Sequence, residues 1–293
     1  MKAVLIINSR AKSVNKRNLA DLRAALQEAK IDFIEMIPDH AKDLERYAEA
    51  AIQDKFDLVI AVGGDGTVGT VASKLVGTNC VFAVIPLGTY NNFARTIGVP
   101  LSIREAVNVI AKGSPKNLDV AEVNGTFFLN GSSIGMYPEI VMRREPLEDN
   151  NNSRLISSWI AALRVLIKFP SYKVRVKVAG EEIIAQTSMI FLGNGFYDYH
   201  FGRMGKRELP DQQKLSVYIL KNMSRWDLFQ LSIKALENRL KGDPKFNRYY
   251  AAEAEIFLEK DSIHVSKDGE VVKLESPLRY RIRPEALKVI LPD

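Results

Sequence analysis

The sequence predicts two domains, an α/β domain with a parallel sheet at the amino end and a mostly antiparallel β domain after it. Short apolar runs alternate with amphipathic segments over residues 1–120, which is typical of parallel strands joined by helices. From Asp119 onward the signals are strands separated by hairpin turns. A chain of 293 residues is long enough for two domains with separate cores. We therefore expect domains at residues 1–120 and 121–293.

Each element of the first domain has its own signal in the sequence. Residues 58–62 are apolar without alternation, as expected of a parallel strand buried on both faces. Residues 18–29 carry leucine and alanine on one side, the pattern of a helix that covers a sheet. We therefore expect a parallel sheet with helices on both faces. The expected order is strand 4–7, helix 18–29, strand 31–37, helix 41–51, strand 57–62, helix 67–75, strand 81–85, and a helix that begins with a capping box at Ser102 and Glu105 and ends at Gly113.

The glycine turn Gly63-Gly64-Asp65-Gly66-Thr67 lies between a strand and a helix start. Backbone N–H groups can cradle phosphate there, because glycine permits close approach and a helix N-terminus adds donors and partial positive charge. The Asp65 carboxylate would repel phosphate unless a divalent cation lay between them. The turn therefore predicts a metal–nucleotide complex, with Asp65 engaging the metal. The alternative is an ordinary turn in which Asp65 and Thr67 cap a helix.

Two further polar stretches follow strands of the same predicted sheet. Residues 8–17 carry four positive charges and no acid, and residues 86–95 contain a hydroxyl and side-chain amides. Ligands of such sheets bind beyond the carboxyl ends of the strands. We therefore expect Asn8, Thr89 and Asn91 to face the same crevice as the glycine turn. A solvated surface loop for the first stretch and a helix cap for the second are the alternatives.

The second domain is defined by strands and turns. Asn124-Gly125 is a type I′ hairpin signature between strands expected at residues 119–123 and 126–130. Helices are expected at residues 155–169 and 225–240. The segment from Arg154 to Gly180 is basic and amphipathic, so its helix either lies against an anionic membrane or packs on the sheet. Further strands are expected at residues 172–179, 183–192, 215–220, 249–258, 262–266 and 271–274.

The composition is that of an ordinary water-soluble protein, with 46% hydrophobic and 26% charged residues. No apolar run approaches the roughly 20 residues that a membrane-spanning helix needs. Cys80 is the single cysteine and the three histidines are scattered, so we expect neither a disulfide nor a zinc site, and a cytoplasmic location. The net charge of +6 favours anionic partners. Nucleic acid is not expected, because no aromatic-rich platform accompanies the charge.

Two turns carry a family resemblance, residues 63–67 and 88–95. Diacylglycerol kinases, including bacterial lipid kinases and sphingosine kinases, pair the same glycine turn with a Gly-Thr-x-Asn-Asp-Phe-Ala turn, and this chain resembles their catalytic domain. The glycine turn by itself is shared with NAD kinases and phosphofructokinases. The resemblance continues through residues 119–125, 128–135, 194–195, 268–270 and 284–289.

The resemblance implies an α/β nucleotide-binding domain and a C-terminal β-sandwich whose last strands, residues 278–293, return towards the first domain. It implies ATP and Mg²⁺, with Asp65 engaging the magnesium nucleotide. Glu270 would be the general base, with Asp268 beside it, since phosphoryl transfer to an alcohol needs a group that receives the hydroxyl proton. By itself Asp268-Gly269-Glu270 predicts a hairpin tip. The residues expected to contact ATP are Asn8, Gly63, Gly64, Asp65, Gly66, Thr67, Thr89 and Asn91.

Three positions depart from the family pattern. Asn92 stands where the family usually has Asp. Gln212 replaces a carboxylate that helps many bacterial members to bind a second, structural magnesium, and a neutral amide is a poorer ligand for a hard cation. Residues 8–12 lack the usual Asn-Pro-x-Ser-Gly form. The chain is therefore expected to be a divergent member.

We expect an ATP-dependent kinase that phosphorylates the hydroxyl of diacylglycerol or a related lipid alcohol. The enzyme would be cytoplasmic and peripheral to the membrane, with residues 154–177 as one possible membrane contact. A homodimer is a further possibility that the sequence does not decide. One alternative is a kinase for a soluble alcohol, as in NAD kinases. The other is a nucleotide- or lipid-binding regulator without transfer activity, which the departures at Asn92 and Gln212 motivate.

Overall fold

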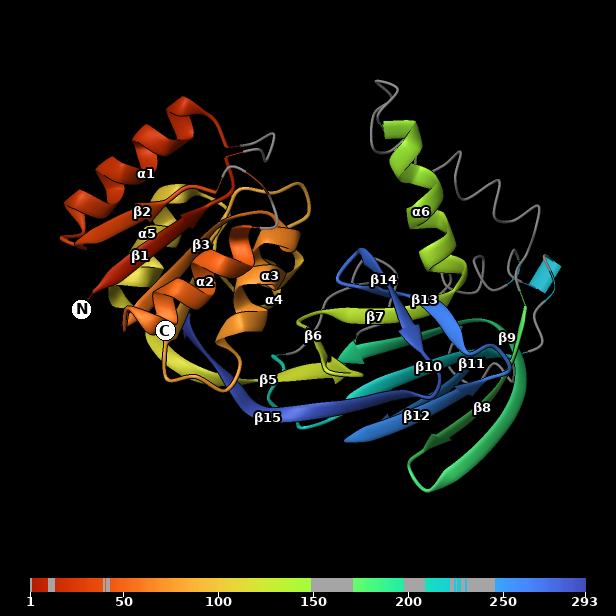
Figure 1. The fold of residues 1–293 in the computed structure, drawn as a ribbon. Helices are drawn as coiled ribbons and strands as arrows, with labels where there is room; N and C mark the ends of the chain where they lie inside the picture. Colours follow the sequence, from red (N-terminus) through yellow and green to blue (C-terminus); the bar gives the residue numbers. More distant parts are fainter. Residues whose placement is uncertain are drawn as a thin grey trace. The chain divides into compact units, whose positions relative to one another are not determined.

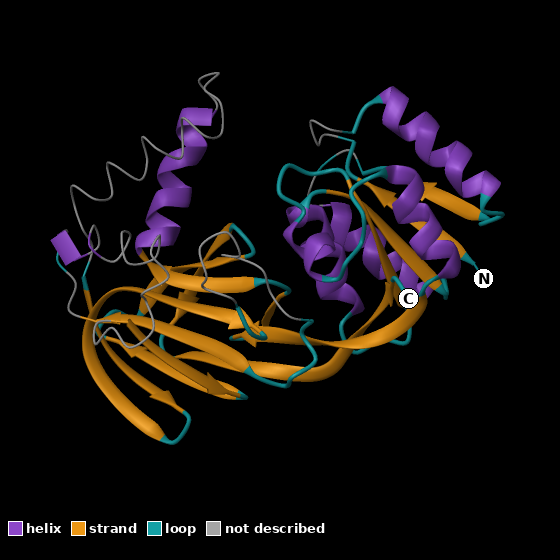
Figure 2. Cartoon of the chain, turned by 180° about the vertical axis from the view of Figure 1, so that it is seen from behind, coloured by secondary structure: helices purple, strands orange, loops and turns teal. Residues whose placement is uncertain are grey.

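The computed structural model describes residues 2–9, 14–38, 40, 43–148, 171–197, 209–221, 224, 226–227, 230 and 246–293, with only the backbone of residues 143–148. The chain divides into two compact units (Figure 1). The first unit contains Met1–Val120, Leu209–Gln212 and Arg283–Asp293, and the second contains Ala121–Glu208 and Gln213–Ile282. The first is α/β and the second is mainly antiparallel β, so the predicted fold class is confirmed. Figure 2 shows this contrast in secondary structure.

Strands and helices alternate in the first unit, as the apolar pattern predicts. They are β1 (Ala3–Ile7), α1 (Lys16–Glu28), β2 (Phe33–Met36), α2 (Asp43–Gln53), β3 (Leu58–Gly63), α3 (Asp65–Leu75), β4 (Val81–Pro86), α4 (Asn92–Thr96) and α5 (Ile103–Lys112).

The strands of the first unit form a parallel sheet in the order β4-β3-β1-β2, and the end of β15 (Leu278–Leu291) pairs with β4. Every residue of β1 and β3 is buried. Crossover connections are right-handed, so the reversal of direction after β2 places α1 on one face and α2 and α3 on the other. In agreement, α1 packs against α5 and α2 packs against α3. This arrangement brings the carboxyl ends of β1, β3 and β4 to one edge of the sheet.

The start of α5 differs from its prediction. Ser102 is the N-cap residue, but its side chain makes no capping hydrogen bond, so the predicted capping box is wrong. The Ser102 backbone is extended, at ψ 131°, and α5 begins at the next residue without a side-chain cap. The predicted end is confirmed, since the Gly113 N–H group donates to Val109 O at 2.8 Å.

The second unit is built of antiparallel strands with one described helix. The strands form the order β14-β13-β7-β9-β8-β12-β15, and β10 joins β9 to β11. The remaining elements, of which β5 begins in the first unit, are β5 (Ser114–Val123), β6 (Thr126–Phe128), β7 (Gly131–Gly135), α6 (Met136–Glu148), β8 (Tyr172–Val178), β9 (Glu181–Asn194), β10 (Leu215–Lys221), β11 (Phe246–Ala251), β12 (Glu253–Leu258), β13 (Ser262–Lys267) and β14 (Glu270–Glu275).

The long strand β9 connects the two layers of the second unit. Its first half pairs with β8, and its second half lies between β7 and β10. Inward-facing residues of both layers, such as Val176, Ile190 and Tyr280, form one hydrophobic core. The outward-facing residues of β8 alternate with them, which is the pattern of a sheet with one face on a core.

Several predictions for the second unit need correction or fall outside the described residues. The single strand predicted at residues 249–258 is two strands, because β11 pairs with β10 whereas β12 pairs with β8 and β15. Helix α6 was not predicted. The predicted helix at residues 155–169 lies outside the described residues. Of the one at residues 225–240 only part of the first turns is described, where Ser224 and Asp227 exchange hydrogen bonds as a helix cap does.

Candidate active site

The glycine turn of the first unit has the predicted strand–turn–helix geometry. β3 ends at Gly63, Gly64 is the N-cap residue, and α3 begins at Asp65, two residues earlier than predicted. The first turn of a helix leaves its N–H groups without intrahelical partners, and they carry partial positive charge. Asp65, Gly66 and Thr67 therefore lie in the part of the helix that favours an anion.

Close contacts explain the glycines at positions 63 and 88. A Cβ atom added to Gly88, in the turn after β4, would collide with the Cα atom of Gly64. A Cβ atom added to Gly63 would lie 2.6 Å from Thr67 Oγ1. The two turns are further joined where the Leu87 N–H group donates to Gly63 O at 2.8 Å. The turns after β3 and β4 thus form one cluster.

Asp65 also joins these two turns. Its Oδ1 atom accepts the Phe93 N–H group at 3.2 Å, at the start of the short helix α4. The Asp65 side chain is half-buried. A carboxylate in this position fixes α4 against α3 and leaves negative charge beside the glycine turn.

Asn8 is part of the same cluster. Its Nδ2 atom donates to Thr67 Oγ1 at 2.9 Å, and its backbone N–H group donates to Val62 O at 3.1 Å. Thr67 is only 4% exposed. The Thr67 hydroxyl therefore connects the end of β1 to the start of α3.

Asn91 shapes the second turn. Its backbone is left-handed, at φ 53°, and it is 6% exposed. Its Oδ1 atom accepts the Gly88 N–H group at 2.8 Å, and its Nδ2 atom donates to Gly88 O at 2.9 Å. Both ends of the amide thus hold the backbone of Gly88, whereas Thr89 is exposed. The contact of Asn91 with ATP stays a prediction.

The remaining predicted residues lie in the second unit, on the hairpin between β13 and β14. Asp268 and Gly269 have φ values of 48° and 90°, which makes the turn type I′. Asp268 Oδ2 accepts the Leu129 N–H group at 2.7 Å, and Oδ1 accepts those of Asn130 and Gly131 at 2.8 and 3.0 Å. The hairpin tip is therefore tied to the turn between β6 and β7.

Glu270 follows this turn and faces solvent. Its side chain is 52% exposed and its carboxylate lies 3.5 Å from Lys267 Nζ. An exposed carboxylate of this kind can approach a bound substrate and accept a proton. Its role as a general base stays a prediction.

Asn194 and Tyr197 complete the surroundings of Asp268. Asn194 is fully buried, and its Nδ2 atom and backbone N–H group donate to the carbonyls of Leu129 and Asn130 at 3.1 and 2.9 Å. The Tyr197 hydroxyl donates to Asn130 O at 2.6 Å. Neither residue was assigned a role from the sequence, although Asn194-Gly195 belongs to the family pattern. An Asn-Gly pair directly after a long apolar strand was the available signal.

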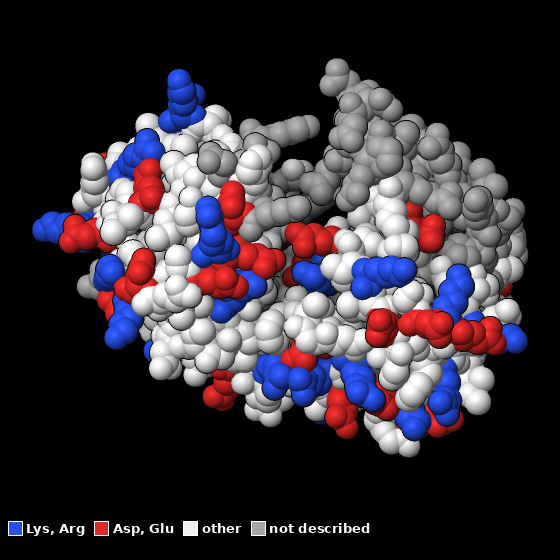
Figure 3. Space-filling model, in the orientation of Figure 1, with Lys and Arg blue, Asp and Glu red and all other residues white. Residues whose placement is uncertain are grey.

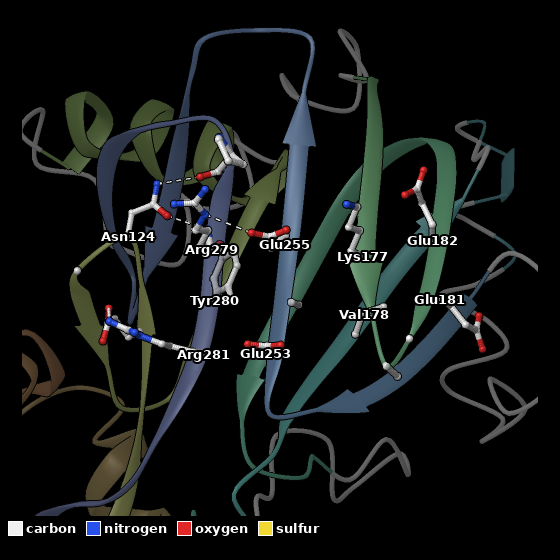
Figure 4. A pocket seen from close by; sticks show the side chains of 16 residues that line it. Asn124, Lys177, Val178, Glu181, Glu182, Glu253, Glu255, Arg279, Tyr280 and Arg281 are labelled. Atoms are coloured by element: carbon white, nitrogen blue, oxygen red, sulfur yellow. Dashed lines mark hydrogen bonds and ion pairs between the residues drawn. The ribbon is translucent and has the colours of Figure 1, made fainter.

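The second unit also contains a pocket, of about 980 Å³, that holds none of the predicted residues. Figure 4 shows its charged side chains on the outer surface of β12, β15 and the hairpin of β8 and β9. Arg281 binds the buried Glu122 at 2.8 Å, and Arg279 binds Glu255 at 3.2 Å. The hydrogen bond with Glu122 is the main cause that raises the pKa of Arg281. Both arginines of the lining are thus paired with carboxylates, and none of the predicted site residues lines the pocket, so it is not our candidate site.

A magnesium nucleotide would suit the cluster in the first unit. Gly64 and Gly88 let the two turns approach closely, and the Asp65 carboxylate could supply an oxygen ligand. Mg²⁺ in nucleotide sites is held by one or two carboxylates with phosphates and water. Within the described residues, no group of three or more His, Cys, Asp or Glu side chains could hold a metal ion without such partners.

The segment with Gln212 lies in the first unit, beside β5. Asp119 is buried, its N–H group donates to Pro210 O at 2.6 Å, and its Oδ1 atom accepts the Glu285 N–H group at 2.9 Å. The buried carboxylate beside this segment thus binds backbone. Among the described residues no metal-binding group forms here.

Comparison with known proteins agrees with this geometry. Residues 2–123 match the model of the diacylglycerol kinase catalytic domain, and residues 148–291 match that of the YegS C-terminal NAD kinase beta sandwich-like domain. A Staphylococcus carnosus protein named "Putative lipid kinase" is 24% identical over 94% of this chain and 92% of its own length.

Two further relatives are a protein and a solved structure. A Staphylococcus aureus (strain JH9) diacylglycerol kinase is 26% identical over 66% of this chain, and the match spans 62% of that relative. A crystal structure of a diacylglycerol kinase from Bacillus anthracis str. Sterne has a TM-score of 0.74 at 23% identity, and covers 99% of this chain and 96% of that one. The structural likeness supports the fold.

Proposed function

Because the chain belongs to the diacylglycerol kinase catalytic-domain family, we propose that it transfers the γ-phosphate of ATP to the hydroxyl of diacylglycerol or a related lipid alcohol. The observation that carries the proposal is the joined pair of turns in the first unit, where Asp65 accepts the Phe93 N–H group beside the contact of Gly64 and Gly88. A simple helix cap would not require a second glycine turn against the first.

In the proposed site, the glycine turn binds the phosphates through backbone N–H groups at the start of α3. Asp65 engages Mg²⁺, which neutralises phosphate charge when it is bound. Asn8 orients Thr67 through its hydrogen bond of 2.9 Å. Thr89, exposed in the second turn, is available to the nucleotide. These residues position the γ-phosphate, and such reactions depend mainly on positioning and charge neutralisation.

Glu270 is the proposed general base. The acceptor oxygen forms a bond to the γ-phosphorus, the bond to the bridging oxygen breaks, and ADP leaves with that electron pair. The hydroxyl proton passes to the Glu270 carboxylate. Lys267 Nζ lies 3.5 Å from this carboxylate at the surface of the second unit, and an exposed ion pair of this kind contributes little.

The acceptor lipid resides in a membrane, so the enzyme would work at the membrane surface. No helix in the described part of the chain is long and apolar enough to cross a bilayer. Figure 3 shows Lys and Arg interspersed with Asp and Glu over the described part of one face, rather than gathered in one patch. Of the predicted contact at residues 154–177, residues 154–170 lie outside the described residues, and residues 172–177 belong to β8.

The test is magnesium-dependent transfer of labelled γ-phosphate from ATP to a panel of lipid alcohols in mixed micelles, with NAD as a soluble acceptor. We expect one lipid class to be labelled. Asp65→Ala should reduce kcat by at least about 100-fold and Glu270→Gln by about 10²- to 10⁴-fold. Asp54→Ala and Glu259→Gln, which change exposed carboxylates outside the site, should behave as wild type.

Two results would contradict this proposal. Labelling of NAD but of no lipid would favour the soluble-alcohol kinase. Tight ATP binding without labelling of any acceptor would favour a nucleotide- or lipid-binding regulator without transfer activity. That alternative is motivated by Asn92 and Gln212, which are amides at positions where the family usually has carboxylates.

A further inference from the structure

We propose that Asp268 is a positioning residue that fixes the Glu270 hairpin, and that it does not touch the substrates. The inference rests on the proposed role of Glu270 as the general base. The place of Asp268 beside Glu270 suggests a pair of catalytic carboxylates. The inference instead gives Asp268 a structural task.

The hydrogen bonds of Asp268 carry the argument. Three consecutive N–H groups, those of Leu129, Asn130 and Gly131, converge on its carboxylate at 2.7 to 3.0 Å. The Asp268 N–H group donates back to Gly131 O at 2.9 Å. Successive backbone N–H groups form an anion-binding nest, and hydrogen bonds to a charged acceptor are about twice as strong as neutral ones. Both carboxylate oxygens are thus engaged by the protein.

The turn that receives Asp268 is itself held from the other side. Its carbonyls accept from the Asn194 side chain and backbone and from the Tyr197 hydroxyl. Because donors and acceptors of the turn are both satisfied within the second unit, it is a rigid support. Asp268 transfers that rigidity to the hairpin.

Glu270 needs this support because little else fixes it. It pairs with Lys267 as the last cross-strand pair of β13 and β14, directly beside the turn. Its side chain is 52% exposed, and Lys267 Nζ is 3.5 Å away. The location of the carboxylate therefore depends on the backbone of the two-residue turn, which Asp268 anchors.

The experiment compares Asp268→Asn with wild type by hydrogen exchange and by kinetics. The amide of Asn cannot accept at both atoms, and its NH₂ group would face an N–H donor. We expect exchange at residues 129–131 to accelerate. We expect kcat to fall by about 10- to 100-fold, as for a displaced catalytic group. The KM for ATP should not change, since the nucleotide residues lie in the first unit.

A double variant separates positioning from a chemical role. If Asp268 acts through Glu270, Asp268→Asn with Glu270→Gln should be no slower than Glu270→Gln alone. Asp261→Asn, which changes an exposed carboxylate in the turn between β12 and β13, is the control and should leave exchange and kcat unchanged. Asp268→Ala, which removes the carboxylate entirely, should accelerate exchange at residues 129–131 at least as much as Asp268→Asn does.

Two results would overturn the inference. Unchanged exchange at residues 129–131 in folded Asp268→Asn and Asp268→Ala would show that the carboxylate is not the anchor. A double variant slower by the product of the two single effects would give Asp268 a chemical task of its own. Failure of the proposed function differs from both, because wild type would then label no acceptor while exchange still reported the anchor.

Discussion

Asp65 and Asp268 are both carboxylates that receive backbone N–H groups, yet their surroundings differ. Asp268 accepts three such groups, none longer than 3.0 Å, whereas Asp65 accepts the Phe93 N–H group at 3.2 Å. A longer hydrogen bond is weaker and adjusts more easily when a charged ligand arrives. Residue type alone therefore does not separate the proposed metal-binding carboxylate from the proposed anchor, and the hydrogen bonds of Asp268 are what support its assignment as the anchor.

Gly88 gives a residue-scale prediction. In Gly88→Ala the new methyl group meets the Cα atom of Gly64, which is backbone and cannot rotate away. We expect the free energy of unfolding to fall by about 1–3 kcal/mol, as for an overpacked core, and Mg²⁺-ATP binding to weaken. Urea unfolding and calorimetric titration measure the two effects. Unchanged ATP affinity would show that the contact between the turns does not shape the nucleotide site.

Cys80 gives a prediction about pH. Burial raises the pKa of its thiol to about 11 from 9.0, with the charge of Asp57 as a smaller cause. Between these values the unfolded chain loses the thiol proton while the folded chain keeps it, so the free energy of unfolding falls as pH rises. Relative to Cys80→Ala, wild type should lose about 1–2 kcal/mol between pH 8 and 10.5. Equal losses in urea unfolding of both proteins would contradict this.

At the scale of elements, local turn chemistry was predictable from sequence. The Asn124-Gly125 pair predicted a type I′ hairpin, and the two residues have φ values of 44° and 83°. The Asn124 side chain has a further task that the pattern did not reveal. Its Nδ2 atom donates to the carbonyls of Glu275 and Pro277. Its Oδ1 atom accepts the Arg279 N–H group, as Figure 4 shows.

Asn124 variants can separate these two tasks. Asn124→Gly loses the three hydrogen bonds but tolerates the left-handed backbone, and should lower the free energy of unfolding by about 1–3 kcal/mol. Asn124→Ala adds the cost of a left-handed alanine and should be about 1 kcal/mol less stable than the glycine variant. Urea unfolding measures both. If the two variants are equally stable, the left-handed backbone at residue 124 does not cost alanine the expected free energy.

Elements that depend on distant contacts were less predictable. Helix α6 contains Pro146 well past its first turn, which usually argues against a helix, yet it forms against β7, β13 and β14. The strand predicted at residues 249–258 divides at Ala252, because the two halves pair with different partners. Neither pairing nor packing is visible in a local pattern, so both errors have the same cause.

At the scale of the whole molecule, the sheets bring distant segments together. The carboxyl ends of β1, β3 and β4 gather Asn8, Thr67 and Gly88 in the first unit, as the strand-end rule predicted. In the second unit, β7 pairs with both β9 and β13, which places Asn194 and Asp268 around one turn. No sequence spacing predicts this second gathering, because it depends on the order of strands in the sheet.

The division into units also predicts which backbone amides a bound nucleotide protects from hydrogen exchange. Mg²⁺-ATP should slow hydrogen exchange most strongly at residues 63–67 and 88–93, because backbone N–H groups at these turns bind the phosphates in the proposed site. At about 100 times Kd it should raise the free energy of unfolding by about 2.7 kcal/mol. Asp65→Ala should lose most of the magnesium dependence of both effects while its exchange elsewhere stays that of wild type. If the slowed amides lay instead in the hairpin of β8 and β9, beside the charged pocket, the nucleotide site would belong to the second unit and the proposed assignment would be wrong.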